Sequence, residues 1–147
     1  MKNVTYPKLL SRFKEILKNN SLKFTTQREA ILRFCYNSKD HFTPEDLRNK
    51  IKEPKIGIAT IYRTLALLEV EKIITSISFG ADGKKYEFGM KDHHDHMICD
   101  KCRKMIEFTD DKIEERQAAI AKSHKFLIKW HILQIHGVCE ECAKVVN

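Results

Sequence analysis

Two short cysteine pairs constrain this chain more than any other feature of its sequence. Cys99 and Cys102 form one C-x2-C pair, and Cys139 and Cys142 form a second. Four thiolates close a tetrahedral site with no open position, which is typical of structural zinc. Such an ion would tie the middle of the chain to its C-terminus and support a small core. A redox-active C-x-x-C is the alternative, but two pairs without a βαβ pattern argue against it.

The composition is that of an ordinary folded protein, with 42% hydrophobic and 32% charged residues among 147. No apolar run approaches the roughly 20 residues that span a bilayer, and residues 1–10 do not resemble a secretory signal. We therefore expect a cytoplasmic protein with no membrane partner, whose paired cysteines bind metal rather than form disulfides. The fifth cysteine, Cys35, lies in an apolar helical pattern and is expected in the core.

Positive charge is concentrated in the first half of the chain. Residues 1–83 hold 15 Lys/Arg against 9 Asp/Glu, whereas residues 84–147 hold 12 against 11. The basic half is the half without the cysteine pairs. This asymmetry suggests that the first half contacts a polyanion, with a merely solvated lysine-rich surface as the alternative.

Helical spacing of apolar residues predicts four helices in the first half, around residues 9–17 and 30–35, from Thr43 to before Pro54, and from 58 to about 70. The last helix would bury its apolar stripe, which comprises Ile58, Ile61, Leu65 and Leu68. Arg63 would then point away from the core, and Tyr62 would lie at the margin. Small residues flank Arg63, so this face could approach a DNA duplex closely.

Two strands, 73–79 and 84–88, follow these helices and are joined by a turn at 80–83. Helices followed by a basic hairpin predict a winged helix-turn-helix, with Lys84 and Lys85 near phosphates.

The second half has a different pattern. We expect short strands at 96–99 and 105–108, then a helix over 110–124 that turns Ile113, Ala118 or Ala119, and Ile120 inward. A final strand over 126–136 would be apolar on both faces. Because a small domain cannot cover both, a second copy of the chain is the simplest partner. The predicted fold class is thus α+β, with a winged-helix domain in 1–88 and a small α/β dimerisation domain with a four-cysteine zinc site in 89–147.

A histidine-rich segment runs into the first cysteine pair. In an extended chain His94 and His96 share one face, while His93 and Asp95 share the other. Two metal sites are therefore possible, one on each face, and ordinary surface histidines are the alternative. Further ligands would come from elsewhere in the chain, and the candidates are Glu87, Glu107, Glu114 and His131.

Four motifs in this order resemble the ferric uptake regulator (Fur) family of bacterial metal-dependent transcription factors. They are residues 57–65 (GIATIYRTL), 93–102 (HHDHMICDKC), 106–108 (IEF) and 137–142 (GVCEEC). The resemblance runs from about residue 9 to 142, and it implies a winged-helix DNA-binding domain followed by a dimerisation domain.

The resemblance also implies roles for individual residues. A structural zinc would take Cys99, Cys102, Cys139 and Cys142. The regulatory site that hinges the two domains would use His41, Glu87, His94, His96 and Glu107. An additional site would use His93, Asp95, Glu114 and His131. Family DNA contacts map onto Lys23 in the minor groove and onto Tyr62 and Arg63 of the recognition helix.

The function that the resemblance implies is a homodimeric repressor of metal uptake genes that binds an A·T-rich palindromic DNA operator. Glu87 and Glu107 favour Fe²⁺ as the signal, since peroxide-sensing relatives tend to have Asp there. Peroxide-, zinc- or manganese-responsive regulation remains an alternative. His136 departs from the family, where an aromatic residue is more usual. It could be a neutral substitution or an alternative ligand that blurs the role of His131.

We expect no enzymatic activity. A divalent-metal hydrolase could use the same histidines and carboxylates, but nothing in the sequence supplies an oxyanion stabiliser or a substrate cleft. A third possibility is a zinc-stabilised protein-interaction module, which would show no metal-dependent change in DNA affinity.

Overall fold

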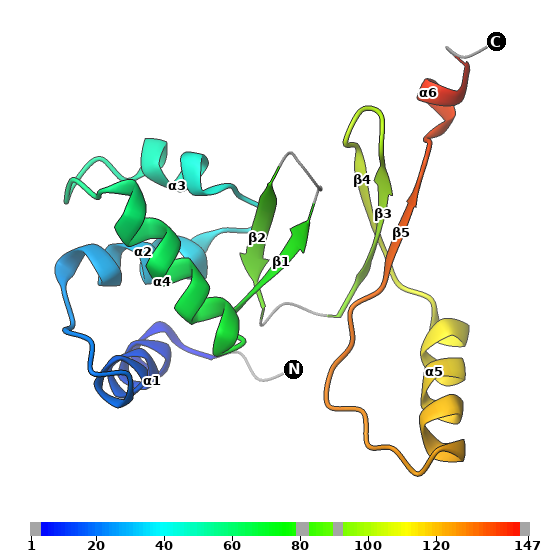
Figure 1. Ribbon diagram of the computed structural model, residues 1–147, viewed down its shortest axis with the longest axis horizontal. Coiled ribbons are helices and arrows are strands. Elements are labelled where there is room, and N and C mark those ends of the chain that lie inside the picture. The colour runs from blue at the N-terminus through cyan, green and yellow to red at the C-terminus, as the bar shows by residue number, and fades with distance from the viewer. Residues whose placement is uncertain (1–3, 79–82, 90–92, 145–147) are drawn as a thin grey trace. The chain divides into compact units, whose positions relative to one another are not determined.

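The computed structural model describes residues 4–78, 83–89 and 93–144 and confirms the α+β class (Figure 1). The chain divides into two compact units, Met1–Lys91 and Asp92–Asn147. The assignment of DNA binding to residues 1–88 and of dimerisation to 89–147 remains a prediction. Among the described helices, none has the length and apolar character needed to cross a membrane.

Four helices build most of the N-terminal unit: α1 (Tyr6–Asn19), α2 (Thr26–Asn37), α3 (Pro44–Lys50) and α4 (Ile58–Val70). Their starts follow from local chemistry. The Thr25 side chain accepts a hydrogen bond from the Arg28 N–H and caps α2. At α3, Thr43 and Asp46 form a reciprocal capping box.

The helices pack around one core, which includes Leu9, Phe13, Ile16 and Leu17 of α1 and, as predicted, Cys35 of α2. In α4 the buried positions are Ile61, Thr64, Leu65 and Leu68. The prediction that Ile58 points inward is wrong, because Ile58 is the first helical residue and is 36% exposed.

A β-hairpin follows α4, formed by β1 (Ile74–Ser78) and β2 (Lys84–Phe88) in antiparallel register. Phe79 and residues 80–82 of the predicted turn lie outside the described residues, whereas Gly83 is described. Phe42 forms an additional antiparallel bridge with Tyr86, in which the nitrogen-to-oxygen distance of both hydrogen bonds is 2.8 Å. This bridge attaches the segment before α3 to the β2 strand.

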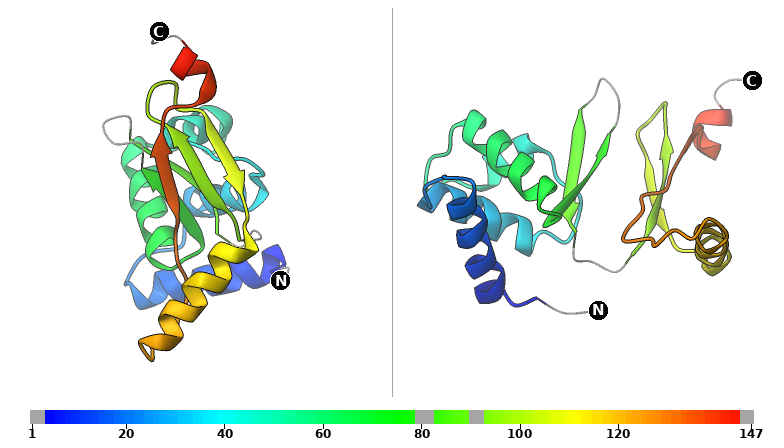
Figure 2. Two further views of the ribbon diagram at one scale, coloured as in Figure 1. Left: turned by 90° about the vertical axis from the view of Figure 1, so that its right-hand side faces the viewer. Right: turned by 60° about the horizontal axis from the view of Figure 1, so that its bottom comes forward.

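The C-terminal unit has a mixed sheet of order β4-β3-β5, with β3 (Asp95–Cys99) in the centre. β4 (Met105–Phe108) is antiparallel to β3, and β5 (Gln134–Gly137) is parallel to it. Helix α5 (Asp111–Ser123) lies largely beyond one end of this sheet, opposite the β3–β4 turn (Figure 2). A short helix, α6 (Glu140–Lys144), ends the described chain.

The predicted strand over 126–136 is mostly wrong, because only residues 134–137 form a strand. Its start belongs to the turn that ends α5, since the Phe126 N–H donates to the Ala121 carbonyl. The strand beside it is also too short, because β3 pairs with β5 only from His96 to Cys99. Residues farther upstream therefore have no neighbouring strand within the described chain.

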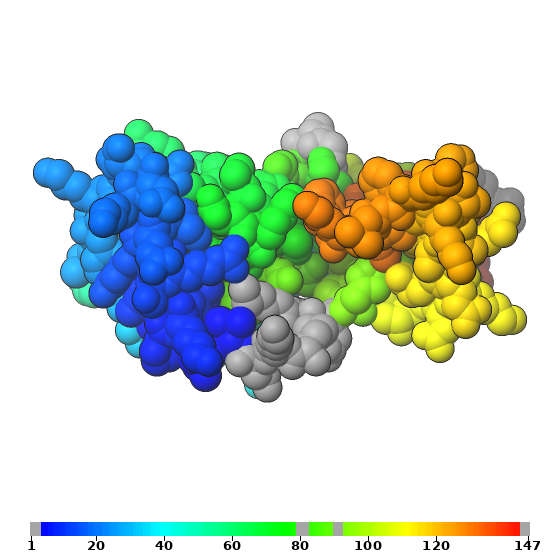
Figure 3. Space-filling view, turned by 90° about the horizontal axis from the view of Figure 1, so that it is seen from below, coloured from blue at the N-terminus to red at the C-terminus, as the bar shows by residue number. Residues whose placement is uncertain are grey.

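Apolar side chains remain exposed over much of the C-terminal unit. No residue of α5 is buried, so the predicted inward stripe of Ile113, Ala118 or Ala119, and Ile120 is not observed, and Ile120 is 48% exposed. Phe126 and Leu127 are 70% and 80% exposed, and Trp130 is 60% exposed. The segment after α5 lies openly on the molecular surface in Figure 3. Its alternating apolar character is thus not used to fill a core within one chain.

Candidate metal sites and nucleic-acid interface

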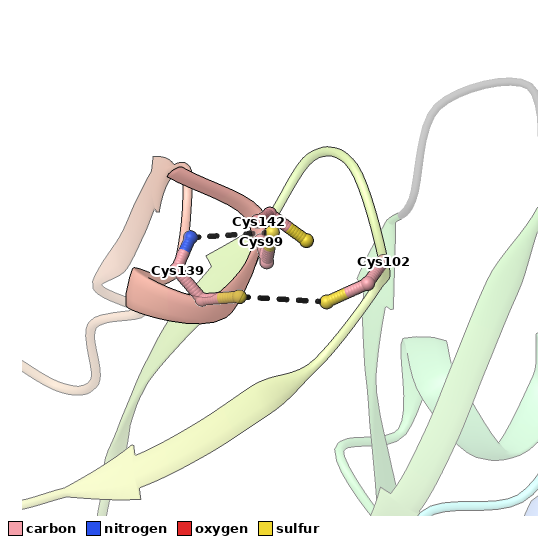
Figure 4. A group of neighbouring side chains, drawn as sticks. All are labelled: Cys99, Cys102, Cys139 and Cys142. Atoms are coloured by element: carbon pink, nitrogen blue, oxygen red, sulfur yellow. Dashed lines mark hydrogen bonds between the residues drawn. The ribbon is translucent and has the colours of Figure 1, made fainter. Parts of the chain in front are cut away.

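The parallel pairing of β3 with β5 brings the two cysteine pairs together. Parallel strands end at the same edge of a sheet, and Cys99 ends β3 opposite Gly137 of β5. Cys139 follows two residues later, Cys102 lies in the β3–β4 turn, and Cys142 lies in α6 (Figure 4). The four sulfur atoms lie within 4.8 Å of one another. They are therefore near enough to bind a single ion.

Hydrogen bonds shift the pKa values of the thiols in this cluster. The Cys139 N–H donates to the Cys99 sulfur at 3.3 Å. Backbone N–H groups of Cys102 and Cys139 lower the pKa of Cys99 to about 6. Hydrogen bonds to the sulfurs of Cys102 and Cys139 raise the pKa of Cys142 to about 12, because they stabilise its protonated thiol. A bound cation would instead stabilise all four thiolates.

An ion pair that the sequence analysis missed joins the two cysteine pairs. The Lys104 Nζ lies 3.0 Å from Glu141 Oε1, which links the β3–β4 turn to α6. Its sequence signal is weak, since it consists of one cation just after the first pair and one acid inside the second. α6 itself was not predicted, because five residues are too few for a helical pattern to be recognised.

On one face of β3, the ligand atoms of His93, Asp95, Glu114 and His131 lie within 4.8 Å of one another. Helix α5 contributes Glu114, whose carboxylate lies 3.1 Å from His93 and 3.3 Å from His131. Asp95 is 1% exposed, and within the described residues neither of its carboxylate oxygens accepts a hydrogen bond. Burying an ionised carboxylate is costly unless a cation balances it. This donor set therefore fits a metal ion.

The opposite face carries His94, His96 and Glu107. His96 pairs directly with Glu107 in the β3–β4 register, and Glu107 Oε1 lies 3.8 Å from His94 Nε2. The two imidazole rings meet edge to face at 4.8 Å between centroids. The predicted separation of the histidine segment onto two faces thus holds, and its role in metal binding remains a prediction.

In the N-terminal unit, His41 lies beside Glu87, with 3.5 Å between His41 Nε2 and Glu87 Oε2. The bridge between Phe42 and Tyr86 explains this contact, since each residue is next to one partner of the bridge. The carboxylate residue Glu87 is buried, with 6% of its surface exposed. These two side chains offer one imidazole and one carboxylate.

His136 is placed away from the His131 cluster. Its Nδ1 lies 3.1 Å from Asp100 Oδ1, next to the cysteine cluster. His131, in contrast, lies with His93, Asp95 and Glu114. The geometry therefore favours His131 over His136 as the fourth member of that group.

The predicted DNA contacts are all exposed. Lys23 precedes α2, while Tyr62 and Arg63 lie on the outer face of α4. The Tyr62 hydroxyl donates a hydrogen bond to the Glu45 carboxylate of α3 at 3.3 Å, a contact that no local sequence pattern predicts. Lys84 is partly engaged at 3.1 Å from Glu69, so it is less available to phosphates than predicted.

Comparison with known proteins decides the family. The sequence model of the Ferric uptake regulator family matches residues 19–136 of this chain. The chain belongs to this family. It is 52% identical to the Ferric uptake regulation protein of Campylobacter jejuni, over 97% of this chain and 93% of the relative. It is 47% identical to that of Campylobacter upsaliensis, over 97% and 94%.

A solved structure supports the same conclusion. The Helicobacter pylori ferric uptake regulator Fur, described as having three functional metal binding sites, is 36% identical, with a TM-score of 0.80 and coverage of 97% of both chains. Membership of the Fur family makes this chain a metal-responsive transcriptional repressor of iron uptake, not an enzyme. The hydrolase alternative is therefore rejected. The four-cysteine cluster and the histidine and carboxylate groups are its candidate metal sites.

Proposed function

We propose that this Fur-family protein senses Fe²⁺ through His41, Glu87, His94, His96 and Glu107, and represses transcription as a cytoplasmic homodimer bound to an A·T-rich palindrome. One ion would take ligands from both units. Metal binding would then fix the angle between two winged helices, so that both recognition helices reach successive major grooves.

The observation that carries this proposal is the division of the donor groups between the units. The N-terminal unit offers His41 and Glu87, and the C-terminal unit offers two histidines and Glu107. Two ligands are too few to hold a divalent ion firmly, whereas five nitrogen and oxygen donors suit Fe²⁺. Shared ligands would therefore make metal occupancy and domain orientation interdependent, which is what a sensor needs.

The other two groups would have supporting roles. We assign zinc to the four cysteines, because a full thiolate set leaves no exchange position. The group on the other face of β3 would hold an additional divalent ion and tie α5 to the sheet through Glu114. Its mixed imidazole and carboxylate donors do not by themselves select one metal.

DNA binding is assigned to the basic N-terminal unit. Lys23 would enter the minor groove of an A·T-rich site, where the narrow groove concentrates negative potential. Arg63 would reach phosphate or base edges in the major groove, and Tyr62 would contact a thymine methyl group. The exposure of these side chains supports the assignment.

A second copy of the chain is the proposed partner of the C-terminal unit. Large apolar side chains are exposed there on neighbouring parts of the sequence, with Leu127 at 80% and Phe126 at 70%. Exposed apolar clusters of this kind mark interfaces in soluble proteins. A two-fold dimer would also present two winged helices to a palindrome.

A DNA-shift titration tests the sensing site. The protein is mixed with DNA under anaerobic conditions and titrated with Fe²⁺, Mn²⁺ or Zn²⁺. We expect Fe²⁺ to raise DNA affinity by roughly 5- to 150-fold, and His94→Ala or Glu107→Ala to abolish that increase. His124→Ala is the matched control, since His124 only closes the end of α5.

The changes in DNA affinity with the three metals distinguish the alternative signals. A larger response to Mn²⁺ or Zn²⁺ would assign the protein to another signal. Loss of the Fe²⁺ response only after peroxide treatment would indicate a peroxide sensor. A full metal response in the His94 and Glu107 variants would show that the sensing site lies elsewhere.

A further inference from the structure

Two neighbouring acids begin α3, and only one of them is needed to start the helix. Asp46 accepts hydrogen bonds from the Thr43 N–H at 2.9 Å and the Thr43 hydroxyl at 2.8 Å, so it completes the capping box. Glu45 takes no part in that box. Its carboxylate instead accepts a hydrogen bond from the hydroxyl of Tyr62, which lies 17 residues further along the chain in α4.

The position of Glu45 is electrostatically unfavourable for DNA binding. A carboxylate beside the outer face of α4 repels phosphates and lowers general affinity for a duplex. Helix α3 gains little from it, because an acid in an exposed first turn stabilises a helix only weakly. The contact with Tyr62 is therefore the feature that distinguishes Glu45 from an ordinary surface acid.

The contact changes what Tyr62 can offer to a base. Tyr62 is 46% exposed, so its ring could otherwise rotate and its hydroxyl could donate to a base acceptor. Desolvation and the nearby Glu45 carboxylate raise the pKa of Tyr62. With its proton committed to Glu45, the hydroxyl can no longer donate to a base acceptor, and the ring carbons, held in place by this contact, match the thymine methyl group in the major groove.

We propose that Glu45 is a positioning residue that exchanges general DNA affinity for thymine recognition by holding the Tyr62 ring through its hydroxyl. This inference rests on the proposed DNA-binding role of α4. It predicts opposite effects on two measurable quantities. Losing Glu45 should strengthen binding to any duplex and weaken discrimination of the thymine methyl.

The experiment uses the full-length, metal-loaded protein and a duplex selected by it from a random-sequence pool. Each thymine is replaced in turn by uracil, which removes only the methyl group. For the wild type we expect about a 4-fold affinity loss at one position in each half-site, the fold-change for about 0.8 kcal/mol of buried CH₂-sized surface. In Glu45→Ala this loss should fall to nearly 1-fold, while affinity for a random duplex rises.

Glu45→Gln is the matched variant, since its amide oxygen can still accept the Tyr62 hydroxyl. We expect it to restore the uracil effect while keeping the higher general affinity. If Gln and Ala behave alike toward uracil, Glu45 acts through charge alone and the inference is overturned. Thermal unfolding of each variant checks that the helices remain intact.

Tyr62→Phe provides a second route, because it removes the hydroxyl and keeps the ring. It should reduce the uracil effect as much as Glu45→Ala does, and the double variant should show the same small uracil effect as either single variant. A full uracil effect in Tyr62→Phe would mean that the hydroxyl does not hold the ring and would overturn the inference. If wild-type protein selects no duplex at all, the proposed function fails instead, whereas selection without any uracil effect overturns only the role of Glu45.

Discussion

The two units bury different kinds of residue. In the N-terminal unit, apolar side chains from all four helices and the hairpin form one core. In the C-terminal unit, the buried residues among those described are Asp95, His96, Ile98 and Cys99, all on β3. Three of these four are candidate metal ligands. The interior of one unit is therefore a hydrophobic cluster, and that of the other is a set of donor groups.

The two units therefore obtain their stability from different sources. Apolar burial stabilises the N-terminal unit without any ligand. Buried donors and carboxylates destabilise the C-terminal unit until cations balance them, and its apolar side chains stabilise it only when another surface covers them. We therefore expect the two units to respond differently to loss of metal, loss of core volume, loss of a partner and acid.

The largest effect should come from removing the proposed zinc. Zinc binding contributes about 10–16 kcal/mol to folding of small metal-dependent domains. We expect Cys99→Ser to expose the amides of β3 and β4 to hydrogen exchange while α1, α2 and α4 keep their protection. Cys35→Ala is the control, because it removes a cysteine from the other unit. Equal protection of β3 in Cys99→Ser and wild type would contradict the comparison.

A core truncation should have the reverse distribution. Phe13 is fully buried in α1, so Phe13→Ala should cost about 3–5 kcal/mol of unfolding free energy in the N-terminal unit. Denaturant titration with hydrogen exchange should show early loss of protection in α1 and α2 and none in β3. Val70→Ala, at a position that is 73% exposed, should change stability by less than about 0.5 kcal/mol. Simultaneous unfolding of both units would show that they are not independent.

Loss of the partner surface should affect association more than folding. Burying a leucine is worth about 1.5–3 kcal/mol, and a two-fold dimer would bury two copies of Leu127. We expect Leu127→Ser to weaken dimerisation at least about 10-fold by analytical ultracentrifugation. Val70→Ser, similarly exposed in the N-terminal unit, should leave the dimer unchanged. A monomeric wild type would refute the proposed partner.

The smallest effect concerns acid and the start of α3. Hydrogen bonds from Thr43 lower the pKa of Asp46 below its ordinary value of 3.8. This stabilisation is fully present above about pH 4 and is lost as the pH falls through the lowered pKa. Asp46→Asn should therefore cost less than about 1 kcal/mol near neutral pH and nothing in strong acid. Unfolding free energies of both proteins across this range provide the measurement.

Acid should affect the C-terminal unit at a higher pH than it affects the α3 cap. Thiolates and imidazoles must lose protons to bind metal, so acidification releases the ions before the α3 cap is affected. Hydrogen exchange of β3 as a function of pH would reveal this order. Loss of the α3 cap before loss of β3 protection would reverse the expected order.

Features that depend on local periodicity and chemistry could be predicted from the sequence alone. Helical spacing predicted the four N-terminal helices, and two-residue alternation correctly separated His94 and His96 from His93 and Asp95. The spacing of the cysteines predicted one cluster, since four thiols so placed have few other uses. These patterns act over a few residues, where backbone geometry dictates the outcome.

Contacts between residues far apart in the chain could not be predicted in this way, because they follow from the fold. His41 lies beside Glu87 because Phe42 pairs with Tyr86, and Cys139 reaches Cys99 because β5 runs parallel to β3. The apolar run at 126–136 forms a strand only where a neighbouring strand exists, and Glu45 meets Tyr62 only because α3 packs on α4. Each outcome depends on pairing or packing between remote segments, which local patterns do not contain.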